Sequence, residues 1–599
     1  MIDKDPRDWY KKQILHLENN LSRLSNKRRL LAWMRLLSIG TAFILLCLFW
    51  SSGLLVALPV FILLLACFLF FVAQDLKNTE KIRHTELLIA INKSEIQVLD
   101  HHFTDRPTGD ELKPASHAYA HDLDIFGKAS LYQYCNRTTS EQGNRVLANW
   151  LLYPTDNRTI LERQASIQEM AGKMEWRQNL EAYGVENRVL QSTQQRIQNW
   201  LQQPNKFQGR NSWKLARILL PVIAFITLGL HIAGIMGASA FYSLVLLYLL
   251  ISLAISKQVM PQYQQLNKIA REMATLSTSI RHIEQETFQT DLLQSLKSEL
   301  GGGSHKASVA VKQLQAILDR MDYRLNPLIF LPLNTFLFWD LQQVMSLEKW
   351  KTEHAKDSEK WFASLSQMEA LSSFGTLYFN NPDWVFPVLR KEDGYFASEN
   401  LGHPLIPTSK RVTSSFASEG PGQISIITGS NMAGKSTFLR SVGINIVLAM
   451  AGAPVCAKRM ISSNLKVMSS MRVSDNLEES VSTFYAELKK LKEIIDAVNR
   501  KEKVILLLDE ILRGTNSADR HTGSSALIRQ LIHHDATGLI ATHDLGLAKL
   551  QDELPTNLHN YHFDVQVANE ELYFDYKLKE GVCSSMNASL LMKKIGIEL

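Results

Sequence analysis

Charged side chains are missing from two long stretches of this sequence. No Asp, Glu, Lys or Arg occurs at residues 36–73 or at residues 218–256. A soluble helix needs far fewer uncharged residues to bury one face, whereas one pass across a membrane takes roughly 20 apolar residues. Each stretch has a candidate turn near its middle, Ser51–Gly53 in the first and Gly234–Gly237 in the second. The sequence therefore predicts two transmembrane helical hairpins, at about 36–73 and 218–256, with four spans in total.

The residues that flank these stretches predict their orientation. Lys and Arg residues precede and follow both stretches, and neither turn carries a charge. Basic residues stay on the cytoplasmic side of a membrane, so both termini and the remaining segments are expected in the cytoplasm. A pair of deeply buried core helices is the alternative interpretation. A signal peptide fits less well, because the first apolar stretch begins only at Leu36 and no small-residue cleavage site follows it.

The chain also has few cysteines and only a small net charge. The five cysteines are scattered and form no C-x-x-C or zinc spacing, so neither a disulfide framework nor a metal site built on cysteine is indicated. The net charge of +6 permits contact with anionic lipid or nucleic acid but indicates neither. No basic patch interleaved with aromatic residues, of the kind that binds nucleic acid, is evident.

Helical patterns dominate the first two thirds of the chain. Ile14, Leu17, Leu21 and Leu24 predict a short amphipathic helix, which packs on its own domain or on a partner. A 3-4-3-4-3 spacing of apolar residues from Leu266 to Ile283 predicts a coiled-coil-like seam on one long helix. Gly301–Ser304 interrupts the pattern, which resumes through about Leu371. A polar break between two helical stretches is typical of a long helical lever that folds back on itself.

From Ile424 onward, strands alternate with helices. Short β-rich runs are expected at 424–428, 504–508, 538–541 and 572–576. The alternation predicts a doubly wound α/β domain. The first run is followed by G-S-N-M-A-G-K-S-T, a complete G-x-x-x-x-G-K-[ST] phosphate-binding loop between a strand and a helix. The predicted ATP-binding residues are Gly429, Ser430, Asn431, Met432, Ala433, Gly434, Lys435, Ser436 and Thr437.

The residue types in this loop point to ATP and Mg²⁺ as cofactors. Its glycines allow backbone N–H groups to surround the β-phosphate at a helix N-terminus. Lys435 is expected to contact the β- and γ-phosphates, and the Ser436 hydroxyl is expected to bind Mg²⁺. The second β run ends in Asp509 and Glu510. We predict that Asp509 assists the magnesium ion and that Glu510 polarises the attacking water.

His543 follows the next strand and is expected to face the γ-phosphate, because the strand ends of such a sheet converge on the ligand crevice. Asp-Glu after one strand and His after the next are typical of the ABC-type branch of P-loop ATPases. A transporter of that branch would carry an L-S-G-G-Q signature, and the sequence has none. A transporter is therefore a weak third hypothesis.

Three motifs carry a specific resemblance to the MutS family of DNA mismatch repair ATPases. Residues 428–437 resemble its T-G-P-N-M-A-G-K-S-T, residues 509–519 its D-E-[IL]-G-R-G-T-S-x-x-D, and residues 482–488 its S-T-F-x-x-E-[ML]. The A-T-H at 541–543 has a counterpart in the family as well. This resemblance covers about 395–599. It implies a homodimer through the ATPase domains, in which Ser482 completes the ATP site of the other chain.

A weaker resemblance covers the helical part. Residues 122–145 with Arg163 resemble the start of the family's core domain, and residues 367–371 resemble its end. The family's mismatch-reading domain has no counterpart, because about 100 residues with a hairpin stand in its place. Leu512 replaces a glycine of the second motif, and Ser430 replaces a proline of the loop.

The predicted architecture is thus an α/β P-loop (ABC-type) ATPase domain plus an all-α core and lever domain, interrupted by membrane hairpins. Its domains are 1–100, 101–394 and 395–599. The family resemblance implies DNA as a partner and a role related to mismatch repair. A membrane-remodelling or membrane-sensing ATPase that no longer binds DNA is the alternative.

Overall fold

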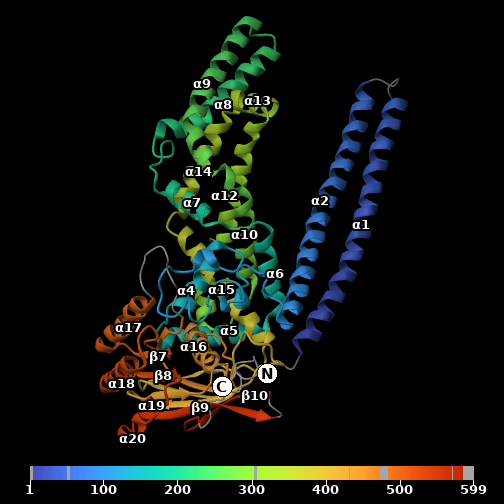
Figure 1. The fold of residues 1–599 in the computed structure, drawn as a ribbon. Coiled ribbons are helices and arrows are strands. Elements are labelled where there is room, and N and C mark those ends of the chain that lie inside the picture. The colour runs from blue at the N-terminus through green and yellow to red at the C-terminus, as the bar shows by residue number, and fades with distance from the viewer. Residues whose placement is uncertain are drawn as a thin grey trace. The chain divides into compact units, whose positions relative to one another are not determined.

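A computed structural model describes residues 5–49, 54–301, 306–430, 432–472, 483–568 and 571–583. The chain forms two compact units (Figure 1). The first contains the residues up to His102 together with Met174–Glu186. The second contains Phe103–Lys173 and the chain from Asn187 onward. The expected phosphate-binding loop and its neighbouring strands all belong to the second unit.

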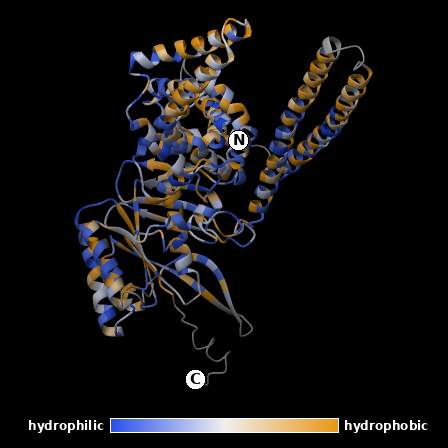
Figure 2. Ribbon diagram, turned by 90° about the horizontal axis from the view of Figure 1, so that it is seen from above, coloured by the Kyte–Doolittle hydropathy of each residue, from blue (hydrophilic) through white to orange (hydrophobic). Residues whose placement is uncertain are grey.

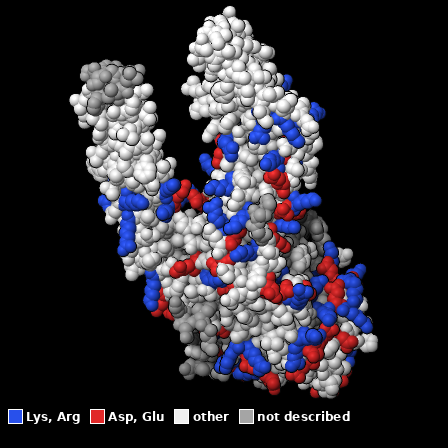
Figure 3. Space-filling model, turned by 180° about the vertical axis from the view of Figure 1, so that it is seen from behind, with Lys and Arg blue, Asp and Glu red and all other residues white. Residues whose placement is uncertain are grey.

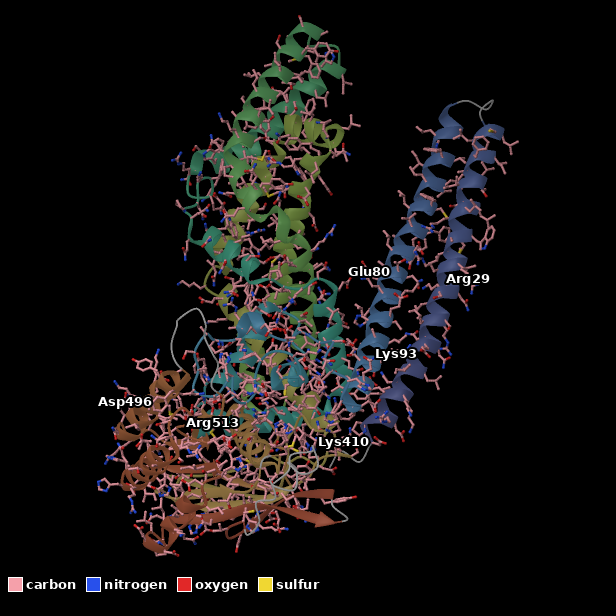
Figure 4. The ribbon with its side chains drawn as sticks, in the orientation of Figure 1. Arg29, Glu80, Lys93, Lys410, Asp496 and Arg513 are labelled. Atoms are coloured by element: carbon pink, nitrogen blue, oxygen red, sulfur yellow. The ribbon has the colours of Figure 1, made fainter. Side chains whose placement is uncertain are left out.

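The first unit is a long helical hairpin. Helices α1 (Pro6–Phe49) and α2 (Leu54–Leu99) pack along each other, and α6 (Met174–Glu186) packs against α2. The predicted amphipathic helix is therefore the start of α1, which continues into the first uncharged stretch. Figure 4 labels Arg29, Glu80 and Lys93 on the polar halves of α1 and α2. The other half of each helix is apolar (Figure 2).

An ion pair marks the border between the polar and apolar halves of this hairpin. Arg35 Nη1 lies 3.1 Å from Asp75 Oδ2, and the Asp75 side chain is only 10% exposed. These two residues are the charged residues nearest to each end of the first uncharged stretch. Opposite charges that border an apolar segment neutralise each other when they meet, which lowers the cost of keeping them close to an apolar medium. The hairpin thus aligns the two ends of the stretch.

The second unit begins with a helical region. Its helices are α3 (Leu131–Cys135), α4 (Glu141–Leu152), α5 (Asn157–Gly172), α7 (Gln191–Gln202), α8 (Asn211–Ile232), α9 (Ala238–Leu266), α10 (Ala270–Gln285), α11 (Asp291–Glu299), α12 (Ala307–Met321), α13 (Pro327–Leu337), α14 (Trp339–His354) and α15 (Ser358–Asn380). Helix α15 packs against α4 and α5. The buried carboxylate of Glu369 accepts hydrogen bonds from Thr139 Oγ1 at 2.5 Å and from Ser140 Oγ. Two segments that are far apart in the sequence therefore meet in this core.

Four helices are long and apolar enough to cross a membrane: α1, α2, α8 and α9. Their most apolar windows are 11%, 6%, 11% and 22% buried, respectively. Among the described residues, these windows are therefore not buried in the core of the single chain. In the view of Figure 3, the described atoms toward the far ends of both hairpins include no Lys, Arg, Asp or Glu.

The predicted single long helix from Leu266 to Ile283 is wrong. Helix α9 ends at Leu266, a 3-10 turn covers Asn267–Ile269, and α10 starts at Ala270. The apolar residues of the predicted seam are nevertheless all buried, and α10 packs along α12. The heptad pattern therefore identified the buried face, and the tighter 3-10 turn interrupts the α-helix without exposing that face. The helical pattern also extends further than predicted, since α15 ends only at Asn380.

The α/β region contains two sheets. The larger has the order β10-β9-β4-β8-β7-β6 and the smaller, which the sequence did not predict, the order β1-β5-β2-β3. The large sheet consists of β4 (Ile424–Thr428), β6 (Lys466–Ser470), β7 (Val504–Asp509), β8 (Thr537–Thr542), β9 (Leu558–Ala568) and β10 (Glu571–Glu580). The small one consists of β1 (Val388–Arg390), β2 (Tyr395–Leu401), β3 (Ser414–Glu419) and β5 (Arg459–Ser463). Within the large sheet only the β9–β10 pair is antiparallel.

Helices cover both faces of the large sheet, which explains its uninterrupted apolar strands. Every residue of β4, β7 and β8 is buried. Helices α17 (Thr483–Asn499) and α18 (Ser517–His533) form one hydrophobic core with Leu506 and Leu508. Helix α16 (Lys435–Ala451) lies against β6, β7 and β8. Parallel strands β4, β7 and β8 consequently end at the same edge, where the predicted site residues follow.

Candidate functional site

At two positions of the glycine-rich loop between β4 and α16, the backbone conformation favours glycine. Gly429 and Gly434 have φ values of +149° and +105°, a region that side chains rarely adopt. A Cβ atom on Gly429 would lie 2.9 Å from the carbonyl oxygen of Phe563, and one on Gly434 would lie 3.1 Å from Tyr576 Cδ1. Helix α16 starts directly after the loop, so its free N–H groups face the same space. These features are compatible with the expected phosphate-binding loop, of which Asn431 lies outside the described residues.

Three predicted side chains meet beside this loop. Lys435 Nζ donates hydrogen bonds to the carbonyl oxygens of Gly429 and Ser430, at 2.9 and 3.0 Å, and lies 3.2 Å from His543 Nε2. His543 Nε2 in turn lies 2.7 Å from Glu510 Oε1. A ring nitrogen that donates its proton to Glu510 cannot also accept one from Lys435. The shorter contact decides the arrangement: His543 pairs with Glu510.

The charges of this cluster shift in the direction that its contacts dictate. The hydrogen bond from His543 lowers the pKa of Glu510 to about 2, against the effect of burial and with help from Arg513 and Lys435. Burial lowers the pKa of Lys435, and the carboxylates of Glu510 and Asp509 oppose that shift. Glu510 is therefore a carboxylate at neutral pH and can orient a water molecule by accepting its hydrogen bond.

Ser436 and Asp509 form the second predicted pair. The Ser436 hydroxyl donates to Asp509 Oδ2 at 2.5 Å. Among the described residues no cluster of three or more His, Cys, Asp or Glu side chains could hold a metal ion by itself. Mg²⁺ is usually held by one or two protein oxygens, with phosphates and water completing its six ligands. A hydroxyl and a carboxylate side by side fit that manner of binding.

Lys435, Ser436, Asp509 and Glu510 line one cavity of about 710 Å³, and His543 is not among its lining residues. Its basic border includes Lys410 and Arg513, both labelled in Figure 4. A largely apolar wall, which the sequence did not predict, faces the loop: Leu401, Ile406, Val412, Phe438, Phe563 and Tyr576. Tyr576 has a φ of +53° at an irregularity in the β9–β10 register. Such bulges redirect side chains, and no local sequence signal marks this one. An apolar wall beside a phosphate-type loop suits a nucleobase.

The S-T-F-x-x-E segment connects to the loop after β7. The buried carboxylate of Glu487 accepts from the backbone N–H groups of Leu512 and Arg513, at 2.5 and 3.2 Å. Leu512 has a φ of +60°, which explains why a glycine suits this position of the family motif. The motif included Glu487, but its role could not be read from the spacing alone. Ser482 lies outside the described residues.

A second buried carboxylate connects the start of the helical region to the α/β region. Asp122 is 1% exposed and accepts from Ser469 Oγ at 2.7 Å and from the N–H groups of Met471 and Arg472 at 3.3 and 3.0 Å. Lys490 Nζ on α17 lies 2.5 Å from its Oδ2. The segment that follows β6 is therefore held by a residue from far upstream.

Comparison with known proteins agrees with the resemblance noted from the motifs. Residues 425–594 match the family model of MutS domain V. The DNA mismatch repair protein MutS of Natronomonas pharaonis is 30% identical over 243 residues, which are 39% of this chain and 27% of that protein. The DNA mismatch repair protein MSH3 of Vanderwaltozyma polyspora is 31% identical over 217 residues, or 34% of this chain and 21% of that protein.

A longer match extends into the helical region. The DNA mismatch repair protein MutS of Chlorobium chlorochromatii is 25% identical over 530 residues, which are 78% of this chain and 57% of that protein. The 30–31% matches, in contrast, span about a quarter of the length of the relatives. The residues matched by the family model include the loop, Glu510 and His543.

Proposed function

The chain is a member of the MutS family, and from this premise we propose that it is a membrane-anchored ATPase. It binds and hydrolyses ATP at a dimer interface and thereby moves its helical region. One observation carries the proposal: Lys435, Glu510 and His543 converge beside a glycine-rich loop, with Ser436 and Asp509 paired next to them. A purely structural cluster would not require an anion-type loop and an ionised carboxylate in the same cavity.

Each residue has a distinct task in this proposal. Lys435 and the loop N–H groups bind the phosphates, and Ser436 and Asp509 hold Mg²⁺, which neutralises phosphate charge when bound. Glu510 orients the attacking water with its carboxylate and accepts a proton from it. His543 holds Glu510 in place and, by donating a hydrogen bond, keeps it ionised.

The dimer interface is part of the proposal, because one such domain leaves the outer side of its ATP open to water. Ser482 of one chain would complete the site that contains Lys435 of the other. Mixing Lys435→Ala chains with Ser482→Arg chains tests this. Each variant alone should be inactive, and a mixed dimer should regain partial activity through its one intact site. Pairing without any recovery would contradict the role in trans.

Membrane anchoring through α1–α2 and α8–α9 follows from three features. The four helices are long and apolar enough to cross, their apolar windows are little buried, and the flanking Arg35 is paired with Asp75. The basic flanks support a cytoplasmic position of the termini and the ATPase domain in this proposal.

The direct test measures Mg²⁺-dependent ATP hydrolysis by the full-length protein in lipid nanodiscs. Lys435→Ala should lose ATP binding, whereas Glu510→Gln should bind ATP and turn it over at least about 100-fold more slowly, the usual effect of removing a general base. Glu502→Gln is the matched control, because Glu502 precedes the same strand at its opposite end. Normal turnover in Glu510→Gln would overturn the proposed role of Glu510.

A role related to DNA mismatch repair is proposed from the names of the relatives. Binding to duplex and branched DNA should be titrated with salt, with and without a non-hydrolysable ATP analogue, because phosphate contacts weaken steeply as salt rises. Absence of binding in both nucleotide states would favour the alternative of a membrane-remodelling or membrane-sensing ATPase.

A further inference from the structure

Helix α13 (Pro327–Leu337) is the most apolar short helix among the described residues. Its sequence, P-L-I-F-L-P-L-N-T-F-L, contains no charge. Eleven residues span about 16 Å, roughly half the thickness of a bilayer core, so α13 cannot cross a membrane by itself. A short apolar helix of this length is a buried core helix, a re-entrant segment or an interfacial helix.

The side chains of α13 are arranged opposite to those of a helix in a water-soluble protein. Its only buried residues are Asn334 and Thr335. Leu328 is 87% exposed, and Ile329 and Leu331 are each 46% exposed. A core helix would bury its leucines and expose its polar groups. The exposure therefore excludes the core-helix interpretation for the described structure.

A hydrogen-bond network holds the polar side of α13 inward. Asn334 Nδ2 donates to Ser256 Oγ of α9 at 2.9 Å, and Asn334 Oδ1 accepts from the N–H of Asp340 at 3.1 Å. Asp340 also accepts from Ser256 Oγ and pairs with Arg324 Nη2, both at 2.5 Å. Arg324 and Asp340 are 5% and 1% exposed. Rotating α13 to bury its leucines would break both hydrogen bonds of Asn334 and leave its buried amide without these partners.

The outward face of α13 is continuous with the hairpin α8–α9. Helix α13 packs against both α8 and α9, and Figure 1 places it beside them. Both helices also expose large apolar side chains, among them Phe225 and Leu250. Tyr323 and Trp339 flank α13 at its two ends, and their rings stack with centroids 5.8 Å apart. Tyr and Trp are enriched where a bilayer meets water.

We propose that α13 is a third membrane element of this unit, an interfacial helix whose Leu328 face lies in the cytoplasmic leaflet beside the hairpin α8–α9. This inference rests on the proposed membrane anchoring of that hairpin. Lipid covers the apolar face of α13, because this face adjoins α8 and α9, whose exposed apolar side chains also require an apolar environment. The Arg324–Asp340 pair then lies directly beneath the membrane surface and fixes the depth of the helix.

Spin-label accessibility in the full-length protein tests this. Cys47 and Cys67, which are exposed, are first replaced by alanine; Cys135, Cys456 and Cys583 are buried. Nitroxides are then attached at Leu328→Cys, at Phe225→Cys on α8 as the lipid reference, and at Val309→Cys on α12 as the water reference. Phe225 and Val309 have the same exposed fraction, 49%. In lipid vesicles, collisions with oxygen report the apolar phase and collisions with a neutral nickel chelate report water.

We expect the label at Leu328 to behave as at Phe225, with collisions with nickel several-fold fewer than at Val309. A lipid signal at Phe225 with a water signal at Leu328 would overturn this inference and leave the anchoring by α8–α9 intact. Water signals at both positions would overturn both. A label at Leu328 that neither reagent reaches would mean that protein, such as a second copy of this chain, covers α13, and would also overturn the inference.

Discussion

Replacing Asp122 by asparagine should loosen the segment that follows β6. Asp122 is almost fully buried and accepts hydrogen bonds from two backbone N–H groups, a serine hydroxyl and Lys490. A hydrogen bond to a buried charged group contributes about 1.5–3 kcal/mol. Asparagine preserves the volume but removes the charge that Lys490 needs. We therefore expect the local opening free energy to fall by about 2 kcal/mol, which corresponds to roughly 30-fold faster opening at about 1.36 kcal/mol per factor of ten.

Hydrogen exchange at the Met471 and Arg472 amides, which donate to Asp122, measures this directly. Asp124→Asn is the matched control, because Asp124 pairs with Arg472 at 2.6 Å but both side chains are partly exposed, at 38% and 48%. Exposed pairs contribute about 1 kcal/mol at most, so exchange should accelerate about fivefold or less. Equal acceleration in both variants, or none in Asp122→Asn, would refute the assignment of Asp122 as the buried anchor.

Two further predictions concern charge and exposure. The depressed pKa of Glu510 means that its pair with His543 stabilises the fold fully above about pH 4.5, the ordinary pKa of a glutamate, and that this contribution disappears as the pH falls towards 2. The melting temperatures of wild type and Glu510→Gln in detergent should therefore differ at pH 5 to 7 and converge only as the pH approaches 2. In sealed vesicles a charged maleimide should label neither Cys47 nor Cys67, because both lie in the apolar halves of α1 and α2. It should not label Cys135 or Cys456 either, because burial raises their thiol pKa values to about 12 and about 11. Rapid labelling of Cys47 would contradict membrane insertion of the first hairpin.

The central strands could be predicted almost to the residue. Strand β4 has the predicted bounds, and β7 and β8 extend the predicted runs by one residue at one or both ends. A strand that is buried on both faces must be apolar throughout, so its sequence is an uninterrupted run. The convergence of Glu510 and His543 was predictable for the same reason, because parallel strands end at one edge.

Other features depend on contacts that a local pattern does not encode. The seam from Leu266 to Ile283 correctly identified a buried face, but periodicity alone does not report a 3-10 turn that interrupts the α-helix and keeps this face buried. The apolar wall of the cavity depends on Tyr576, whose orientation follows from a register shift between β9 and β10. Asp122 looked like part of a family motif, and its partners lie more than 340 residues further along the chain.

The left-handed backbone conformation of Leu512 affects how substitutions at positions 512 and 523 combine. Its Cδ1 atom lies 2.7 Å from where a Cβ atom on Gly523 would be placed, so its side chain occupies the space that any larger residue at position 523 would need. A glycine at 512 would relieve the backbone and free that space, whereas alanine at 523 with Leu512 in place requires the leucine side chain to shift. The effects of the two substitutions are therefore coupled: Gly523→Ala should be tolerated more easily after Leu512→Gly than before it.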